Sequence, residues 1–205
     1  MNDQYYTADP HSESKPVPCA FPYRGYGLNF MTDAGVFSRG ELDVGSRLLL
    51  DALPELSGDV LDLGCGWGAI GVAVAKANRA ARVVMADVNH RALGLTQENC
   101  DRNGVTAEVI ESDGMAAVMG RKFDAIVTNP PIRAGKQVIY RMFADAAVSL
   151  RAGGALYLVI RKQQGAESCV KYLKTLFDTV EKLDKSGGFW VLKASGPKED
   201  TSDAV

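Results

Sequence analysis

Hydrophobic residues along this chain fall into two kinds of run, which alternate over most of its length. Short apolar runs rich in Val and Ile indicate buried strands, and longer runs with an apolar residue every three or four positions indicate helices. Strands are expected over residues 59–63, 82–87, 107–112, 123–128, 155–160, 179–183 and 189–194. Helices are expected over residues 44–53, 69–77, 90–103, 136–150 and 166–177.

This order of elements predicts the fold class. Strands that alternate with helices of about 10–15 residues pair in parallel, and the helices form the crossovers. The last two strands are joined by a tight turn over residues 185–188, so they should pair antiparallel. We therefore predict an α/β fold with a doubly wound, mostly parallel seven-stranded sheet, helices on both faces and an antiparallel last strand. Ligands of such Rossmann-like sheets bind beyond the C-terminal ends of the strands.

The two ends of the chain differ from its middle. Residues 1–20 are rich in Asp, Ser, Pro and Tyr, which predicts a flexible N-terminal arm. Residues 21–31 alternate aromatic and polar side chains around a glycine-containing turn, which predicts a short hairpin. Residues 196–205 form a polar, acidic tail. We expect a single domain over residues 21–195.

Composition narrows the class of protein. The 205 residues are 46% hydrophobic and 23% charged with a net charge of −2, which is ordinary for a globular domain. No apolar run is long enough for a membrane helix, and residues 1–18 contain no signal-peptide segment. The cysteines match no metal-binding spacing, so we expect free thiols, no metal and a cytoplasmic protein. These cysteines are Cys19, Cys65, Cys100 and Cys169.

A glycine-rich turn is the first sign of a binding site. Residues 64–68 read Gly-Cys-Gly-Trp-Gly and lie between an expected strand and an expected helix. Glycines permit positive φ and let a ligand approach the backbone closely. Asp87 ends the next strand, where a carboxylate can accept hydrogen bonds from two ribose hydroxyls. Nicotinamide dinucleotides and S-adenosylmethionine both use this geometry, and Ala69 at the position of the third fingerprint glycine does not decide between them.

Two further features favour the methyl donor. Asp62 lies just before the glycines, where its carboxylate can face the ammonium group of a ligand. Residues 129–132 read Asn-Pro-Pro-Ile and follow the fourth strand. Because proline has no N–H, this turn presents carbonyl acceptors with few competing donors. The Asn129 amide oxygen and the Pro130 carbonyl could both accept from one planar NH₂ group and stabilise the positive charge that develops on it during methylation.

These segments resemble a known family. Residues 62–68 resemble the first motif of class I S-adenosylmethionine-dependent methyltransferases, and residues 129–132 resemble the fourth motif of those that methylate planar nitrogens. Residues 129–136, 32–38 and 43–46 also resemble the ribosomal RNA small-subunit methyltransferase C group, which methylates the exocyclic N2 of guanine. The resemblance implies S-adenosylmethionine as cofactor and RNA, most specifically ribosomal RNA or a ribosomal particle, as partner.

The resemblance also assigns roles to residues. Asn129 and Pro130 would hold the target amine and are the expected catalytic residues. The expected cofactor-binding residues are Asp62, Gly64, Gly66, Asp87 and Asp113. The expected substrate-binding residues are Phe37, Pro131, Ile132, Arg133 and Lys136. Phe37 could equally be a core aromatic. A phosphate-binding rim near the strand ends would be formed by Arg133, Lys136, Arg161 and Lys162, joined by Arg24 and Arg39.

The chain departs from the family pattern in two ways. Longer members have two methyltransferase-like halves, whereas this chain has room for one. Ile132 stands where many adenine and glutamine methyltransferases have an aromatic residue that stacks on the target, which disfavours adenine. Adenine N6 and protein glutamine N5 remain alternative targets. A nicotinamide oxidoreductase and a non-catalytic cofactor-binding or RNA-binding module are more distant alternatives, and the sequence does not specify an oligomeric state.

Overall fold

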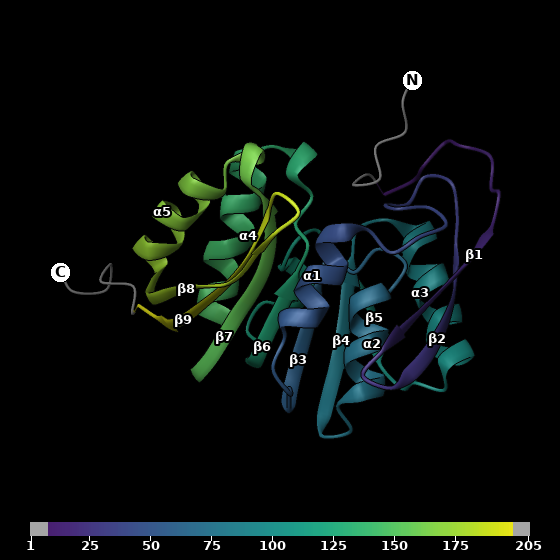
Figure 1. Cartoon of the computed structure of the whole chain (residues 1–205), viewed down its shortest axis with the longest axis horizontal. Helices are drawn as coiled ribbons and strands as arrows, with labels where there is room; N and C mark the ends of the chain where they lie inside the picture. Colours follow the sequence, from purple (N-terminus) through teal and green to yellow (C-terminus); the bar gives the residue numbers. More distant parts are fainter. Residues whose placement is uncertain (1–7, 199–205) are drawn as a thin grey trace.

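The fold is a seven-stranded sheet covered by helices on both faces (Figure 1), and the computed structural model describes residues 8–198. The strand order is β5-β4-β3-β6-β7-β9-β8. Only β9 runs opposite to the other six strands of the sheet, which confirms the predicted fold class. The sheet strands are β3 (Gly58–Leu63), β4 (Ala81–Asp87), β5 (Glu108–Glu111), β6 (Phe123–Thr128), β7 (Leu150–Arg161), β8 (Phe177–Ser186) and β9 (Phe189–Pro197).

The helices divide between two hydrophobic cores, one on each face of the sheet. On one face lie α1 (Val44–Ala52), α2 (Ala69–Ala77) and α3 (His90–Asn103), and on the other lie α4 (Lys136–Ser149) and α5 (Ala166–Leu176). Successive side chains of a strand point to opposite faces. Along β7, Tyr157 and Val159 accordingly join the first core, while Leu158 and Ile160 join the second. No helix among residues 8–198 has the length and apolar character needed to cross a membrane.

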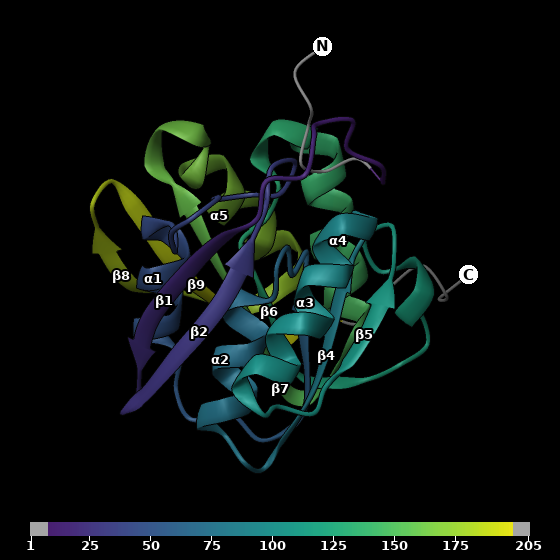
Figure 2. The ribbon, with the colours of Figure 1, turned by 90° about the vertical axis from the view of Figure 1, so that its right-hand side faces the viewer.

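A two-stranded hairpin packs outside α2 and α3 (Figure 2). It consists of β1 (Val17–Tyr23) and β2 (Tyr26–Thr32), and its turn residues Arg24 and Gly25 have φ of 45° and 83°. Positive φ at both central residues fits the right-handed twist of the two strands. The prediction that the arm extends to residue 20 is wrong at its end, because Val17–Ala20 pair with β2 and bury Cys19.

Two buried asparagines of α3 connect the hairpin to the domain. Asn99 accepts from Met31 N at 2.7 Å and donates to Met31 O at 2.9 Å. Asn103 makes the same pair of bonds with Asn29, at 3.0 and 2.8 Å. These amides provide partners for backbone groups along the edge of β2 that does not pair with β1.

The N-terminal segment before β1 lies against the start of α3. Ala8 O accepts from His90 N at 2.9 Å, and Arg91 donates to Ser12 O at 2.8 Å. Residues 1–7 of the expected arm and residues 199–205 of the expected tail lie outside the described residues. Short 3₁₀ helices that the pattern did not predict follow β5, β6 and β7: η1 (Ala116–Val118), η2 (Ile132–Ala134) and η3 (Lys162–Gln164).

Candidate active site

A cavity of about 250 Å³ opens at the C-terminal ends of β3, β4 and β6. This is the edge at which a doubly wound sheet binds its ligands. The cavity brings together most of the predicted site residues: Phe37, Gly64, Gly66, Asp87, Asp113, Asn129, Pro130 and Pro131. The glycine turn and the Asn-Pro-Pro turn, which are far apart in sequence, therefore form parts of one cavity wall.

The glycine turn leaves room for a ligand against its backbone. Gly64 and Gly66 have φ of 74° and 56°, and a Cβ built on either would meet no atom within 4 Å. Gly68 differs, because a Cβ there would come within 3.1 Å of Thr96. The first two glycines thus keep open space beside the cavity, and the third permits close packing of α2 against α3.

Asp87 holds the glycine turn in place. Its Oδ2 accepts from Gly66 N at 2.8 Å and its Oδ1 accepts from Asn89 N at 2.9 Å. Burial raises the pKa of this carboxyl group. Each carboxylate oxygen has more than one acceptor site, so Asp87 retains capacity to accept from ligand hydroxyls in the cavity.

Asp62 lies beneath the turn and does not line the cavity. Its Oδ2 accepts from Gly71 N at 2.7 Å. Among the side chains of residues 8–198, its Oδ1 is the one buried oxygen or nitrogen without a hydrogen-bond partner. Burial, reinforced by the negative charge of Asp87, raises the pKa of Asp62 to about 7. An unpartnered buried carboxylate is costly, so a cationic group above the turn would be favoured by this charge.

Asn129 is fixed through its amide nitrogen. Nδ2 donates to Ser46 Oγ at 3.0 Å and lies 3.3 and 3.4 Å from the two carboxylate oxygens of Asp43. The following residue, Pro130, is buried, so its backbone is held by packing. Asp43 and Ser46 also line the cavity, although the sequence assigned them no role.

Phe37 lies on the cavity wall with 38% of its surface exposed, so it is not a core aromatic. Its backbone oxygen accepts from Trp67 Nε1 at 2.8 Å, which ties the loop before α1 to the glycine turn. The wall opposite is formed by α4, where Arg141 pairs with Asp145 at 3.7 Å. The sequence did not identify these two residues, because neither belongs to a motif.

Three predicted substrate residues lie outside the main cavity. Ile132 is half-buried and packs against the second core, and Lys136 lies over the ring of Tyr140 at 5.0 Å. Both line a smaller hollow between α4 and α5. Arg133 is exposed on η2. All three follow the Asn-Pro-Pro turn, in η2 and at the start of α4, and lie outside the main cavity.

The prediction that Arg24 joins a rim at the cavity is wrong. Arg24 donates to Leu53 O and to Asn78 Oδ1, which are the C-terminal caps of α1 and α2. Each of these helices leads into a parallel strand, α1 into β3 and α2 into β4, so both end at the N-terminal edge of the sheet, opposite the cavity. Arg39 donates to Lys15 O at 2.8 Å and so ties the loop before α1 to the N-terminal segment.

The cysteines contribute no nucleophile to the site. All four are buried as free thiols. Burial raises the pKa of the Cys65 thiol well above its usual value, so it stays protonated at neutral pH. Within the described part of the chain, no group of His, Cys, Asp and Glu side chains is arranged to hold a metal ion.

The sheet with its single antiparallel strand, and a cavity lined by the glycine turn, define an S-adenosylmethionine-dependent methyltransferase domain of class I. More particularly, the chain belongs to the methyltransferase small domain family, whose model matches residues 27–193. The family match confirms the predicted resemblance and, at the level of the family, the predicted cofactor. It excludes the nicotinamide oxidoreductase that the glycine turn alone had left open.

Relatives and solved structures agree with this family. The chain is 41% identical over 198 residues to YbxB of Bacillus subtilis, which is named as an uncharacterized protein. This alignment covers 95% of this chain and 98% of YbxB. It is 39% identical to ribosomal RNA small subunit methyltransferase C of Vibrio cholerae, over 75% of this chain and 44% of the relative. A 16S rRNA N2 methyltransferase of T. thermophilus, solved with AdoMet and guanosine, matches with a TM-score of 0.80 and 32% identity, over 91% of this chain and 52% of that chain. The chain therefore spans about half the length of these two methyltransferases.

Proposed function

We propose that this methyltransferase transfers a methyl group to the exocyclic N2 of guanine in ribosomal RNA. The observation that carries the proposal is the acceptor turn at Asn129 and Pro130, which shares one cavity with the glycine turn. Two similar proteins named as ribosomal RNA methyltransferases, one of them solved with guanosine, support this target over other planar amines.

The residues present fit S-adenosylmethionine. The open Cβ positions of Gly64 and Gly66 leave space for its methionine part, and the unpartnered Oδ1 of Asp62 suits a nearby ammonium group. Asp87 would accept from the ribose hydroxyls, and the exposed Asp113 after β5 would accept from the adenine amino group. When bound, S-adenosylmethionine supplies an electrophilic methyl group on a sulfonium.

The acceptor turn would orient the target. Asn129 Oδ1 and Pro130 O would each accept one N–H of the guanine amine, which leaves the nitrogen electron pair free on one face. That pair would form the new bond to the methyl group that bound S-adenosylmethionine supplies, with its sulfur as the leaving group. The nitrogen would become positive and then lose a proton to solvent. Both oxygens stabilise the charge as it grows, because they are already in position.

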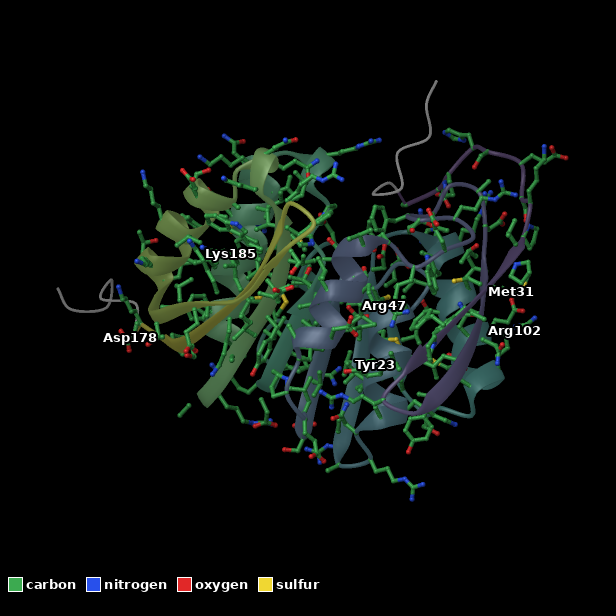
Figure 3. All side chains as sticks on the ribbon, in the orientation of Figure 1. Tyr23, Met31, Arg47, Arg102, Asp178 and Lys185 are labelled. Atoms are coloured by element: carbon green, nitrogen blue, oxygen red, sulfur yellow. The ribbon has the colours of Figure 1, made fainter. Side chains whose placement is uncertain are left out.

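RNA would approach from the target side of the cavity. Exposed cations gather there at η2, at the end of β7 and beside the β8–β9 turn, where Figure 3 labels Lys185. These residues are Arg133, Lys136, Arg161, Lys162 and Lys185, and none forms an ion pair with another described residue. The cofactor side instead carries Asp87, Glu111 and Asp113. Phosphate groups are therefore attracted to the target side.

The test is methylation of ribosomal RNA and of ribosomal particles by the purified protein with isotopically labelled S-adenosylmethionine. Digestion to nucleosides and mass spectrometry should find the label in N2-methylguanosine. Label in N6-methyladenosine, or in ribosomal protein rather than RNA, would replace guanine N2 with one of the alternative targets.

A further inference from the structure

We propose that Asp43 and Ser46 form an orientation lock, which holds the Asn129 amide with its oxygen toward the target amine. Both are positioning residues that act through Asn129. The inference rests on the proposed function for its effect on the rate, whereas the lock itself is a property of the folded chain.

The lock follows from the donors and acceptors that meet at Asn129. The two hydrogens of its Nδ2 are directed at Ser46 Oγ and at the Asp43 carboxylate. An ionised carboxylate can only accept hydrogen bonds. If the amide were rotated by half a turn, its oxygen would face the carboxylate oxygens, and Asp43 would lose its bond from Asn129. Asp43 therefore excludes the rotated state.

The excluded state is also the one that would not bind the target. With its NH₂ group toward the cavity, Asn129 would present donors to an amine that is itself a donor. With the oxygen toward the cavity, it presents an acceptor, and among the described residues no group donates to this oxygen. The charge of Asp43 has a second effect, because a charge-assisted bond to Nδ2 polarises the amide and strengthens its oxygen as an acceptor.

Asp43 is itself rigidly held, as a positioning residue must be. It is the N-cap of α1, and its Oδ1 accepts from Ser46 N at 3.1 Å. Gly45 leaves little freedom beside it, because a Cβ there would lie 3.0 Å from Asp43 Oδ1 and 3.2 Å from Phe189. Phe189 begins β9, so the cap is enclosed between α1 and the sheet.

The helix that carries the cap is fixed by the hairpin. Arg47 donates to Pro22 O at 2.9 Å, and the Tyr23 hydroxyl donates to Leu50 O at 3.2 Å. Figure 3 shows Tyr23 and Arg47 close together where the hairpin meets α1. Leu49 and Leu50 are fully buried in the first core. Packing in the core thus fixes the position of Asp43. Asp43 in turn fixes the amide of Asn129, which lies 86 residues further along the chain.

The test uses Asp43→Ser, because serine is as good an N-cap as aspartate but can also donate. We expect an unchanged melting temperature and unchanged affinity for S-adenosylmethionine, with kcat lower by roughly tenfold or more because the amide is free to rotate. Asp51→Ser is the matched control, since it removes the same charge from an exposed position on α1 and leaves Asn129 untouched. In an Asn129→Ala background, Asp43→Ser should lower kcat no further, because the two residues act as one unit.

The lock would be overturned if Asp43→Ser lowered kcat equally in the wild-type chain and in Asn129→Ala. It would also be overturned if Asp43→Ser lowered the melting temperature in parallel with kcat. A second readout does not depend on the substrate. The side-chain NH₂ resonances of Asn129, assigned by NMR in the full-length protein, should shift in Asp43→Ser and not in Asp51→Ser. Unchanged resonances in Asp43→Ser would overturn the lock even if guanine proved not to be the target. Shifted resonances in a protein that methylates no RNA would keep the lock and refute only the proposed function.

Discussion

Two side-chain oxygens near the cavity, of Asn129 and Asp62, accept no hydrogen bond from any described residue. Asn129 Oδ1 faces the site because its amide nitrogen is bound to Asp43 and Ser46. Asp62 Oδ1 is buried and unpartnered beneath the glycine turn. Under the proposed function, the first oxygen would accept from the amine that is methylated and the second would attract the positive charge of the methyl donor.

At the residue scale, Asn129→Ala should lower kcat by roughly a hundredfold or more, as expected for the loss of one preorganised acceptor. Affinity for S-adenosylmethionine should stay the same, because Asn129 is on the target side of the cavity. Single-turnover kinetics together with calorimetry would separate the two quantities. A variant with an unimpaired rate would exclude the acceptor role.

The raised pKa of Asp62 predicts a pH-dependent affinity for the cofactor. At pH values below the Asp62 pKa of about 7, this carboxyl group is protonated in the protein without cofactor. The carboxyl group must lose its proton before it can attract an ammonium group. Affinity should therefore fall as pH drops below the pKa, by up to about tenfold per unit. Titration calorimetry between about pH 5.5 and pH 7 keeps an α-amino group charged throughout. Asp62→Asn should flatten this dependence, and an equally steep profile in that variant would remove Asp62 from the site.

Among the elements around the cavity, the glycine turn contains glycines with two different roles. Gly66 lies beside open space, and Gly68 packs against α3. Gly66→Ala places a methyl group in the open space beside the cavity, so affinity for S-adenosylmethionine should fall roughly tenfold or more. Gly68→Ala instead forces a Cβ to within 3.1 Å of Thr96, so the free energy of unfolding should fall more than in Gly66→Ala. Both variants also carry about 1–2 kcal/mol of left-handed backbone strain, which makes them matched controls for each other. Denaturant unfolding measures the free energy of unfolding of the two variants, and calorimetry measures their affinity for S-adenosylmethionine. If the two variants lost equal amounts of both, the two glycines would not have separate roles.

Most elements were predictable because their ends carry local signals. The bounds of α3 match the prediction, since Asn89 caps its start and Gly104, with φ of 59°, ends it. The strand β7 begins at Leu150 rather than at the predicted residue 155, because paired glycines such as Gly153-Gly154 are typical of a turn. Gly154 is instead a place of close approach, where a Cβ would come within 3.0–3.1 Å of backbone carbonyls.

Only those residues of the candidate site that belong to a sequence motif could be predicted. Residues within the glycine turn and the Asn-Pro-Pro turn were found, because strand–turn–helix order places both at one edge of the sheet. The link from Asp43 to Asn129 was not found, because no local pattern reports a contact between residues so far apart in sequence. Ile132 was placed at the target by motif position, yet its side chain packs into the second core.

At the scale of the whole molecule, charge is distributed unevenly around the cavity. The net charge is only −2, but exposed cations of η2, of the end of β7 and of the β8–β9 turn lie near the Asn-Pro-Pro turn without an ion-pair partner among the described residues. Arg133→Ala and Lys162→Ala should each weaken RNA binding and reduce the slope of log affinity against log salt by about one. Arg79→Ala removes the same charge at the opposite edge of the sheet and should leave both unchanged. Equal effects at the two edges would mean that RNA binding is not directed to the cavity.

We propose that this chain methylates guanine N2 in ribosomal RNA, with the acceptor turn holding the amine. Nucleoside mass spectrometry of ribosomal RNA tests it most directly, in cells that lack the gene and carry either the wild-type chain or Asn129→Ala. We expect N2-methylguanosine to be reduced without the gene, restored by the wild-type chain and not restored by the variant. The same N2-methylguanosine content in all three strains would contradict it.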